Sequence, residues 1–276
     1  MGIWVWGGVL LVLALASLAG AALPGAAPDL HHRFAPPSLT HPLGTDELGR
    51  DELFRLLAGG RVSLLVGIMA SLAAAGLGTL IGLIAGFRGG LVDTCLMRIT
   101  DGVIALPLLP LLIVLAAIDL GKLGLPAELA QSEGMSLYRI IVLVALIGWT
   151  TVARLVRAAT LSLKAQDFVR AAVALGVRQG RIQRVHILPN LASPIIVATS
   201  LSVGHVILLE SVLSFLGLGI EPPLTSWGNM LTGAQELMSL DPALALYPGL
   251  LIFITVMACN FLGDALTLTR LRERAG

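Results

Sequence analysis

The chain has 276 residues, of which 56% are hydrophobic and only 13% are charged. An average soluble domain has roughly 25% charged residues, whereas the mean hydropathy here is +0.90. These values exclude an ordinary water-soluble domain and also a disordered chain, which needs low hydrophobicity and high charge. A formal net charge of +1 gives no sign of a nucleic-acid partner. The composition indicates a membrane protein.

Six apolar runs are long enough to cross a bilayer, because a hydrocarbon core about 30 Å thick needs roughly 20 helical residues. They lie near residues 3–23, 62–87, 95–118, 138–163, 193–216 and 246–268. Strand alternation is absent from these runs, so we expect an all-α polytopic membrane protein and not a barrel. The predicted units are a first transmembrane helix (1–23), an external loop (24–61), a five-helix transmembrane core (62–268) and a tail (269–276).

The first run has small residues near its end, as a cleaved signal peptide has. However, no basic residue precedes it and its apolar stretch is longer than usual, so we expect a retained helix.

The Lys and Arg residues predict the orientation. Twelve of the 18 fall on the side of the predicted spans that holds both termini, and six fall on the other side. Because basic residues concentrate in cytoplasmic loops, we expect both termini in the cytoplasm.

The external loop changes character at Thr45, where an amphipathic helical pattern begins and runs through Asp51 and Phe54. This pattern predicts a short helix on the outer membrane surface before the second span. The three histidines of the loop show no compact ligand spacing, so we expect no metal site.

Glycine recurs every fourth residue in the second span, at Gly78, Gly82 and Gly86. Small residues at this spacing allow helix backbones to approach closely, so they predict a packed helix interface, within the chain or with another subunit. In the third span, Pro107 and Pro110 predict a kink.

Residues 164–192 are too polar to span a membrane, yet they show helical periodicity. Asp167 is a suitable helix N-cap and Gly176 a suitable stop. Between them, four apolar residues fall at helical spacing: Phe168, Ala171, Ala172 and Leu175. A second short helix would carry Arg178, Arg181 and Arg184 before Pro189 closes the unit. This helix–glycine–helix unit predicts a docking element. The alternative is an ordinary surface loop that carries the basic residues of the cytoplasmic side.

Two carboxyl groups, Asp101 and Glu210, fall inside apolar spans, where a charge costs several kcal/mol unless it faces a cavity or a partner. Each therefore either lines a water-filled path or tethers two helices. For Glu210 the two interpretations have equal weight, and Ser214, one helical turn further on, would share its position. For Asp101 the tether is favoured. The Gly- and Pro-rich stretch that follows, with Trp227, predicts a re-entrant or interfacial segment on the outer side.

The sequence contains no Walker A, GxSxG or HExxH motif and no recognisable pair of nucleophile and base. We therefore predict no catalytic residues, and any work against a gradient must draw its energy from a partner or an ion.

The stretch RAAVALGVRQGRIQRVHILPN (Arg170–Asn190) resembles the "EAA" loop of bacterial ABC-transporter permeases. Ala171, Ala172, Gly176, Leu188 and Pro189 match the pattern in register. Arg170 replaces the usual Glu, which reverses a charge at the docking surface, and His186 replaces an Ile. Four further stretches are similar to the second permease subunit of dipeptide, oligopeptide and nickel importers. They are HPLGTDELGRD (His41–Asp51), GLIAGFRGGLVD (Gly82–Asp93), LLESVLSFLGLGIEPPLTSWG (Leu208–Gly228) and PGLLIFITVMACNFLGDAL (Pro248–Leu266).

The resemblance implies a six-helix permease of the type I ABC importer kind in the bacterial inner membrane. It implies four partners: a homologous sister permease, two cytoplasmic ATPases that bind ATP and Mg, and an external solute-binding protein. It implies no cofactor on this chain. The residues expected to couple to the ATPases are Asp167, Phe168, Arg170, Ala171, Ala172, Leu175, Gly176, Arg178, Arg181, His186 and Pro189. Those expected along the translocation path are Asp101, Glu210 and Ser214.

The expected solute is a dipeptide or oligopeptide, and the alternatives within the family are a nickel chelate, a metallophore or glutathione. An ion-coupled secondary transporter would use Asp101 and Glu210 as titrating groups. An intramembrane hydrolase is a further alternative, for which no nucleophile–base pair is recognisable.

Overall fold

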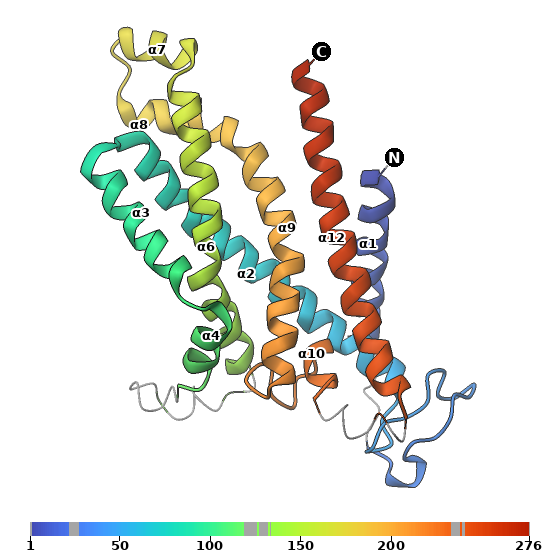
Figure 1. Cartoon of the computed structure of the whole chain (residues 1–276). Helices are drawn as coiled ribbons and strands as arrows, with labels where there is room; N and C mark the ends of the chain where they lie inside the picture. The colour runs from blue at the N-terminus through green and yellow to red at the C-terminus, as the bar shows by residue number, and fades with distance from the viewer. Residues whose placement is uncertain are drawn as a thin grey trace.

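The structure is a computed structural model that describes residues 2–21, 28–118, 134–232 and 241–275, together with residues 126, 132 and 238. Its long helices are α1 (Gly2–Ala21), α2 (Glu52–Arg88), α3 (Gly90–Ala105), α4 (Leu108–Ala116), α6 (Met135–Lys164), α9 (Leu188–Phe215) and α12 (Ala243–Ala275) (Figure 1). Across the described residues, the only extended pairing is one bridge between Thr45 and Asp51. The all-α class is confirmed.

Five of these helices are long and apolar enough to cross a membrane, and the bent pair α3–α4 makes six if it counts as one span. The predicted spans agree with these helices to within a few residues at most ends. The end predicted for the first span, residue 23, lies outside the described residues. The apolar span in α12 ends at Leu268, and the helix continues through the residues of the predicted tail to Ala275.

The second span begins earlier than its apolar run. The helix α2 starts at Glu52, and the Asp51 carboxylate accepts the backbone N–H of Phe54 at 3.2 Å as its N-cap. The separate surface helix predicted from Thr45 is therefore wrong, since the residues from Thr45 to Asp51 form turns and the amphipathic pattern belongs to the first turns of α2.

The α2 and α6 helices pack closely through the glycine row. A Cβ at Gly78 would lie 2.6 Å from the carbonyl oxygen of Trp149, and one at Gly86 would lie 2.8 Å from Cβ of Thr160. Gly82 meets the Ala153 carbonyl oxygen even more closely. The predicted packed interface is confirmed, and it lies within the chain.

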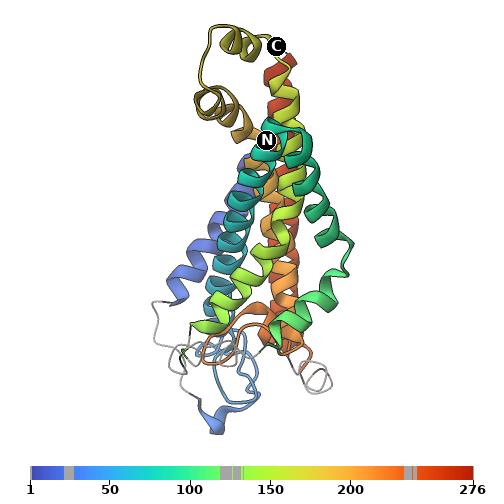
Figure 2. The same ribbon diagram turned by 90° about the vertical axis from the view of Figure 1, so that its left-hand side faces the viewer.

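The third span is broken by 85° between α3 and α4. Leu106 is extended there, with φ −74° and ψ 138°, and Pro107 caps α4. Because proline disfavours a helical conformation in the residue before it, Pro107 explains the break. Figure 2 shows the bent pair along one side of the bundle, away from α1.

The 164–192 loop contains α7 (Asp167–Ala174), α8 (Gln179–Arg181) and the π-helical turn η3 (Ile182–Ile187), which continues into α9. Two details differ from the prediction. Gln166 is the N-cap of α7, with Asp167 the first helical residue. Pro189 lies in the first turn of α9 and does not close the unit. Because η3 runs into α9 without a break, Pro189 stands where the π-helical turn changes to α-helix and not at a free helix start.

The molecule has two distinct ends. The helices α7 and α8 lie at one end, which also holds the two ends of the chain (Figures 1 and 2). We call this the α7 end. The loop before α2 and the turn after α9 lie at the other, which we call the loop end.

Candidate translocation and coupling surfaces

Glu210 lies in a buried polar network near the end of α9. It is 0% exposed, and its carboxyl group accepts hydrogen bonds from the hydroxyls of Ser63 at 3.2 Å and Ser214 at 2.7 Å. Ser63 and Ser214 in turn accept the backbone N–H groups of Trp227 at 3.1 Å and Ile220 at 3.0 Å. The network joins α2, α9 and the segment after α9. Glu210 and Ser214 are thus structural tethers in this conformation and do not line an open path.

The segment after α9 folds back into the bundle. Its short helix α10 (Trp227–Met230) is closed by a capping box between Ser226 and Asn229. Trp227 is 1% exposed, and its indole N–H donates to the carbonyl of Leu56 at 2.8 Å. This agrees with a re-entrant segment, and the tryptophan fixes it to α2.

Asp101 is an interhelical tether of another kind. It lies towards the end of α3 and pairs with Arg154 of α6 at 2.6 Å, with both side chains about half exposed. Asp93 near the start of α3 binds Arg157 of α6 through two contacts, one of them 2.6 Å long. The sequence favoured a tether for Asp101 without naming its partner, which is the Arg154 guanidinium. These two pairs fix α3 to α6.

A pocket of about 500 Å³ opens on the concave side of the α3–α4 break, between these helices, α6 and α9. Its wall is mainly apolar, and its polar lining residues are Thr150, Thr151, Ser202 and His205. The sequence did not predict this pocket, because the periodicity of a helix does not show which faces of different helices pack against each other. His205 had a signal of its own, since it is ionisable and lies within an apolar span, the criterion that selected Asp101 and Glu210.

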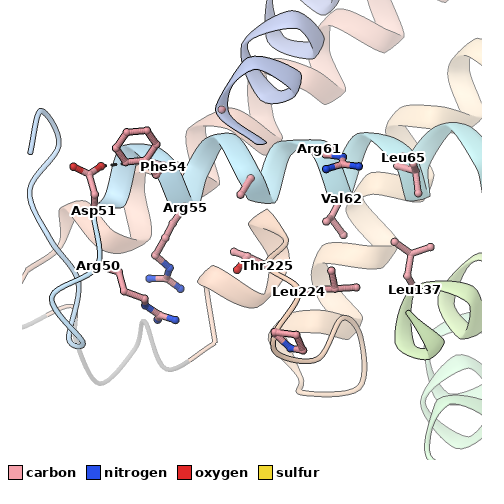
Figure 3. A pocket seen from close by; sticks show the side chains of 13 residues that line it. Arg50, Asp51, Phe54, Arg55, Arg61, Val62, Leu65, Leu137, Leu224 and Thr225 are labelled. Atoms are coloured by element: carbon pink, nitrogen blue, oxygen red, sulfur yellow. Dashed lines mark hydrogen bonds between the residues drawn. The ribbon is translucent and has the colours of Figure 1, made fainter. Parts of the chain in front are cut away.

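A second pocket of about 530 Å³ lies at the loop end (Figure 3). Its lining includes three arginines of α2 and of the segment before it, Arg50, Arg55 and Arg61, together with Leu224 and Thr225. Arg50 and Arg55 each contact the buried carboxylate of Asp46 at 2.7 Å. Arg61 is exposed and has no ion pair within the described chain. Asp51 also lines the pocket, so three arginines and one carboxylate belong to its wall, which is basic on balance.

At the other end, one face of α7 packs into the chain and another remains exposed. Val169 is 2% and Ala172 6% exposed, in a cluster with Ile182 and Ile187. Ala172, which the sequence assigned to the partner-facing surface, is therefore part of the chain's own core. Phe168 and Leu175 are 44% and 82% exposed, and Ala171 is exposed beside them. We call Phe168, Ala171 and Leu175 the α7 patch.

The residues around the α7 patch also have defined positions. The Phe168 ring lies 6.4 Å from the ring of His186 in η3. Gly176 has φ +74°, a conformation that a Cβ penalises, so the predicted glycine stop is confirmed. The Arg170 guanidinium is 69% exposed and lies 3.9 Å from the Asp167 carboxylate. Arg178 and Arg181 are also exposed. Within the described residues, no cluster of His, Cys, Asp or Glu could hold a metal ion.

Together these features define the class: a multi-pass helical membrane protein with an exposed helical element at one end and a pocket among its spans. Residues 78–268 match the family of binding-protein-dependent transport system inner membrane components, and the chain belongs to this family. It is a permease subunit of an ABC transporter, as the resemblance implied.

Several permeases of known systems are similar to the chain. The oligopeptide transport system permease protein OppC of Haemophilus influenzae is 38% identical over 82% of this chain and 68% of its own length. The glutathione transport system permease protein GsiD of Pectobacterium atrosepticum is 39% identical over 94% and 82%. The dipeptide transport system permease protein DppC of Alkalihalophilus pseudofirmus is 38% identical over 85% and 73%. A solved chain of an amino acid ABC transporter is 18% identical and covers 79% of this chain and 94% of its own, with a TM-score of 0.49.

Proposed function

We propose that this permease pairs with a homologous sister permease to import short peptides that an external binding protein delivers. Two ATPase subunits on the cytoplasmic side bind ATP and Mg and drive the cycle, while this chain binds no cofactor and has no catalytic residue. The observation that carries the proposal is the α7 patch, an exposed apolar surface at one end of a chain of this family.

The α7 patch suits an ATPase partner for a physical reason. A helix of 8 residues is too short to be stable alone in water, so α7 depends on what it packs against. Val169 and Ala172 hold one side to the chain, and Phe168, Ala171 and Leu175 leave an apolar side for a partner to cover. Around it, Arg170, Arg178 and Arg181 offer positive charge, and exposed ion pairs of this type contribute about 0–1 kcal/mol each.

We place the α7 end in the cytoplasm, with both termini, and the loop end outside. The distribution of Lys and Arg along the chain supports this orientation. The basic pocket of Figure 3 would then face the side from which the solute arrives.

The relatives support a peptide as the solute, since their names specify oligopeptides, dipeptides and glutathione. A nickel chelate or metallophore is the alternative. An ion-coupled mechanism is disfavoured because Glu210 is enclosed by hydroxyl groups and Asp101 is paired with Arg154.

A pair of substitutions on α7 tests the coupling role. Leu175→Asp places a charge in the α7 patch, and Val173→Asp places the same charge at a residue that is 60% exposed outside the patch. We expect Leu175→Asp to abolish co-purification of the ATPases and ATP-driven peptide uptake by reconstituted vesicles, while Val173→Asp retains both. Normal coupling in the Leu175→Asp complex would contradict the proposal.

A further inference from the structure

We propose that the pocket inside the α3–α4 break is a wall of the translocation path, where His205 hydrogen-bonds the peptide backbone of the solute in transit. The inference rests on the proposed function and adds to it a site and a mode of recognition. Four groups carry it: Thr150 and Thr151 of α6, and Ser202 and His205 of α9.

The position of His205 along α9 places it deep in the bilayer. It lies ten residues before the helix ends at Phe215, which at 1.5 Å per residue is roughly 15 Å, or half of a hydrocarbon core about 30 Å thick. Ionisable side chains at such depth usually face a water-filled cavity or a partner group and not lipid. His205 is exposed, and the described residues provide no hydrogen bond to its ring. Its ring nitrogens are therefore open to water in the pocket or to a solute that displaces this water.

The hydrogen-bonding capacity of the four groups matches an amide. Thr150 and Ser202 donate their hydroxyl protons to the carbonyls of Ile147 at 3.1 Å and Ala198 at 2.8 Å, so their lone pairs remain free to accept N–H groups. A neutral imidazole offers one donor and one acceptor. Thr151 is exposed and, like His205, has no hydrogen bond to another described residue. The pocket can thus satisfy both the N–H and the C=O groups of a peptide backbone.

The rest of the wall indicates tolerance of different side chains. None of the described residues that line the pocket is Asp, Glu, Lys or Arg. A wall without charged groups neither attracts nor repels a solute according to the charge of its side chains. Its apolar surface can contact any side chain that fits the available volume. The volume of about 500 Å³ lies within the range of roughly 300–1,000 Å³ that small-molecule sites occupy. The pocket therefore selects a backbone and not a sequence.

A second occupant would also satisfy His205: a helix of the sister permease seated permanently in the pocket. The test uses the assembled transporter in vesicles with its binding protein, and labelled dialanine, trialanine and glutathione as probes. His205→Phe keeps an aromatic ring and removes both hydrogen bonds, whereas His205→Gln retains a donor and an acceptor. Leu208→Phe is the matched control, because Leu208 is 42% exposed on the same helix and does not line the pocket.

We expect His205→Phe to lower the uptake rate at least about tenfold, because one lost hydrogen bond can cost that much and this variant loses two. Assembly and ATPase co-purification should be unchanged. His205→Gln should restore most of the rate, and Leu208→Phe should resemble the native complex. Normal uptake by His205→Phe would overturn the inference alone. Loss of the sister permease from the His205→Phe complex would overturn it in favour of the helical occupant. A native complex that imports none of the three probes would overturn the proposed function as well.

A labelling experiment provides a readout that does not depend on uptake. With Cys95 replaced by Ser, His205→Cys should react with a small membrane-impermeant thiol reagent, and an imported peptide should slow the reaction. Cys259 is buried and serves as the unreactive reference. A residue at position 205 that faces lipid or a fixed helix would not react, and that result would overturn the inference.

Discussion

A single methyl group at Gly82 would overlap the backbone of the neighbouring helix. The carbonyl oxygen of Ala153 in α6 occupies the space where a Cβ at Gly82 would be, and Cβ of Val156 lies 2.9 Å from that position. One of these atoms is in the backbone of α6 and the other is bonded directly to it, so neither can move without the helix. A side chain at Gly82 can therefore be accommodated only if the two helices separate. Residue Gly76, on the same helix, meets nothing within 4 Å.

Gly82→Ala and Gly76→Ala therefore make a matched pair. We expect Gly82→Ala to destabilise the purified permease by about 1–3 kcal/mol, the usual cost of overpacking. Gly76→Ala should be neutral or slightly stabilising, because alanine loses less backbone entropy in a helix than glycine. Thermal unfolding in detergent measures both. Equal melting temperatures for the two variants would show that Gly78, Gly82 and Gly86 do not determine the distance between α2 and α6.

The sequence predicted which polar residues need a partner better than it predicted which residue the partner is. The cost of a carboxyl group in an apolar span marked Glu210 and Asp101 as groups that require partners, and both have them. The partners are distant in sequence: Ser63 is 147 residues from Glu210, and Arg154 is 53 residues from Asp101. Periodicity along one chain segment carries no information about such contacts. His205 met the criterion that selected Glu210 and Asp101, an ionisable group in an apolar span, and was overlooked.

Among the elements, α3 depends on α6 for its position more through ion pairs than through apolar packing. Thr100 is the one buried residue of α3, while Arg157–Asp93 and Arg154–Asp101 link it to α6 at two levels. The side chains of the first pair are 33% and 14% exposed, and those of the second are 49% and 48% exposed. Water screens the second pair more strongly, so the first should contribute more stability.

A double-mutant cycle tests this ranking. Asp93→Asn and Arg157→Gln, singly and together, should give a coupling free energy of about 1 kcal/mol, near the upper limit for accessible pairs. The corresponding cycle for Asp101 and Arg154 should give a smaller value. Unfolding of the purified permease in denaturant provides the four free energies of each cycle. A larger coupling in the half-exposed pair would contradict the ranking.

Hydrophobic pattern predicted which segments are helices, and it was least accurate where polar and apolar signals overlap. The start of α2 was placed too late because Glu52 and Arg55 interrupt its apolar run, yet both face a buried cluster with Asp46. In α7, a two-turn pattern could not decide which apolar side faces the chain. Val169 was overlooked, and Ala172 was assigned to the wrong side. Both errors arise from tertiary packing, which the local sequence does not encode.

On the scale of the whole molecule, the proposed orientation makes a simple prediction. In a Cys95→Ser background, Thr40→Cys lies at the loop end and Gly180→Cys at the α7 end, and both residues are exposed. An impermeant maleimide added to sealed cells should label Thr40→Cys and should label Gly180→Cys only after the membrane is opened. Labelling of Gly180→Cys in sealed cells would reverse the assignment of sides.

The length of α2 has a mechanical consequence. Its 37 residues extend roughly 55 Å at 1.5 Å per residue, well beyond a hydrocarbon core of about 30 Å, and the helix runs obliquely across the bundle (Figure 1). One of its ends carries the arginine-lined pocket, and at the other the Phe87 carbonyl accepts a hydrogen bond from Lys164, the last residue of α6, at 2.6 Å. The helix α2 is continuous from Glu52 to Arg88 and contains no proline. We therefore expect a displacement of the loop end of α2 to be felt at the base of the α7 unit, through the contact of Phe87 with Lys164.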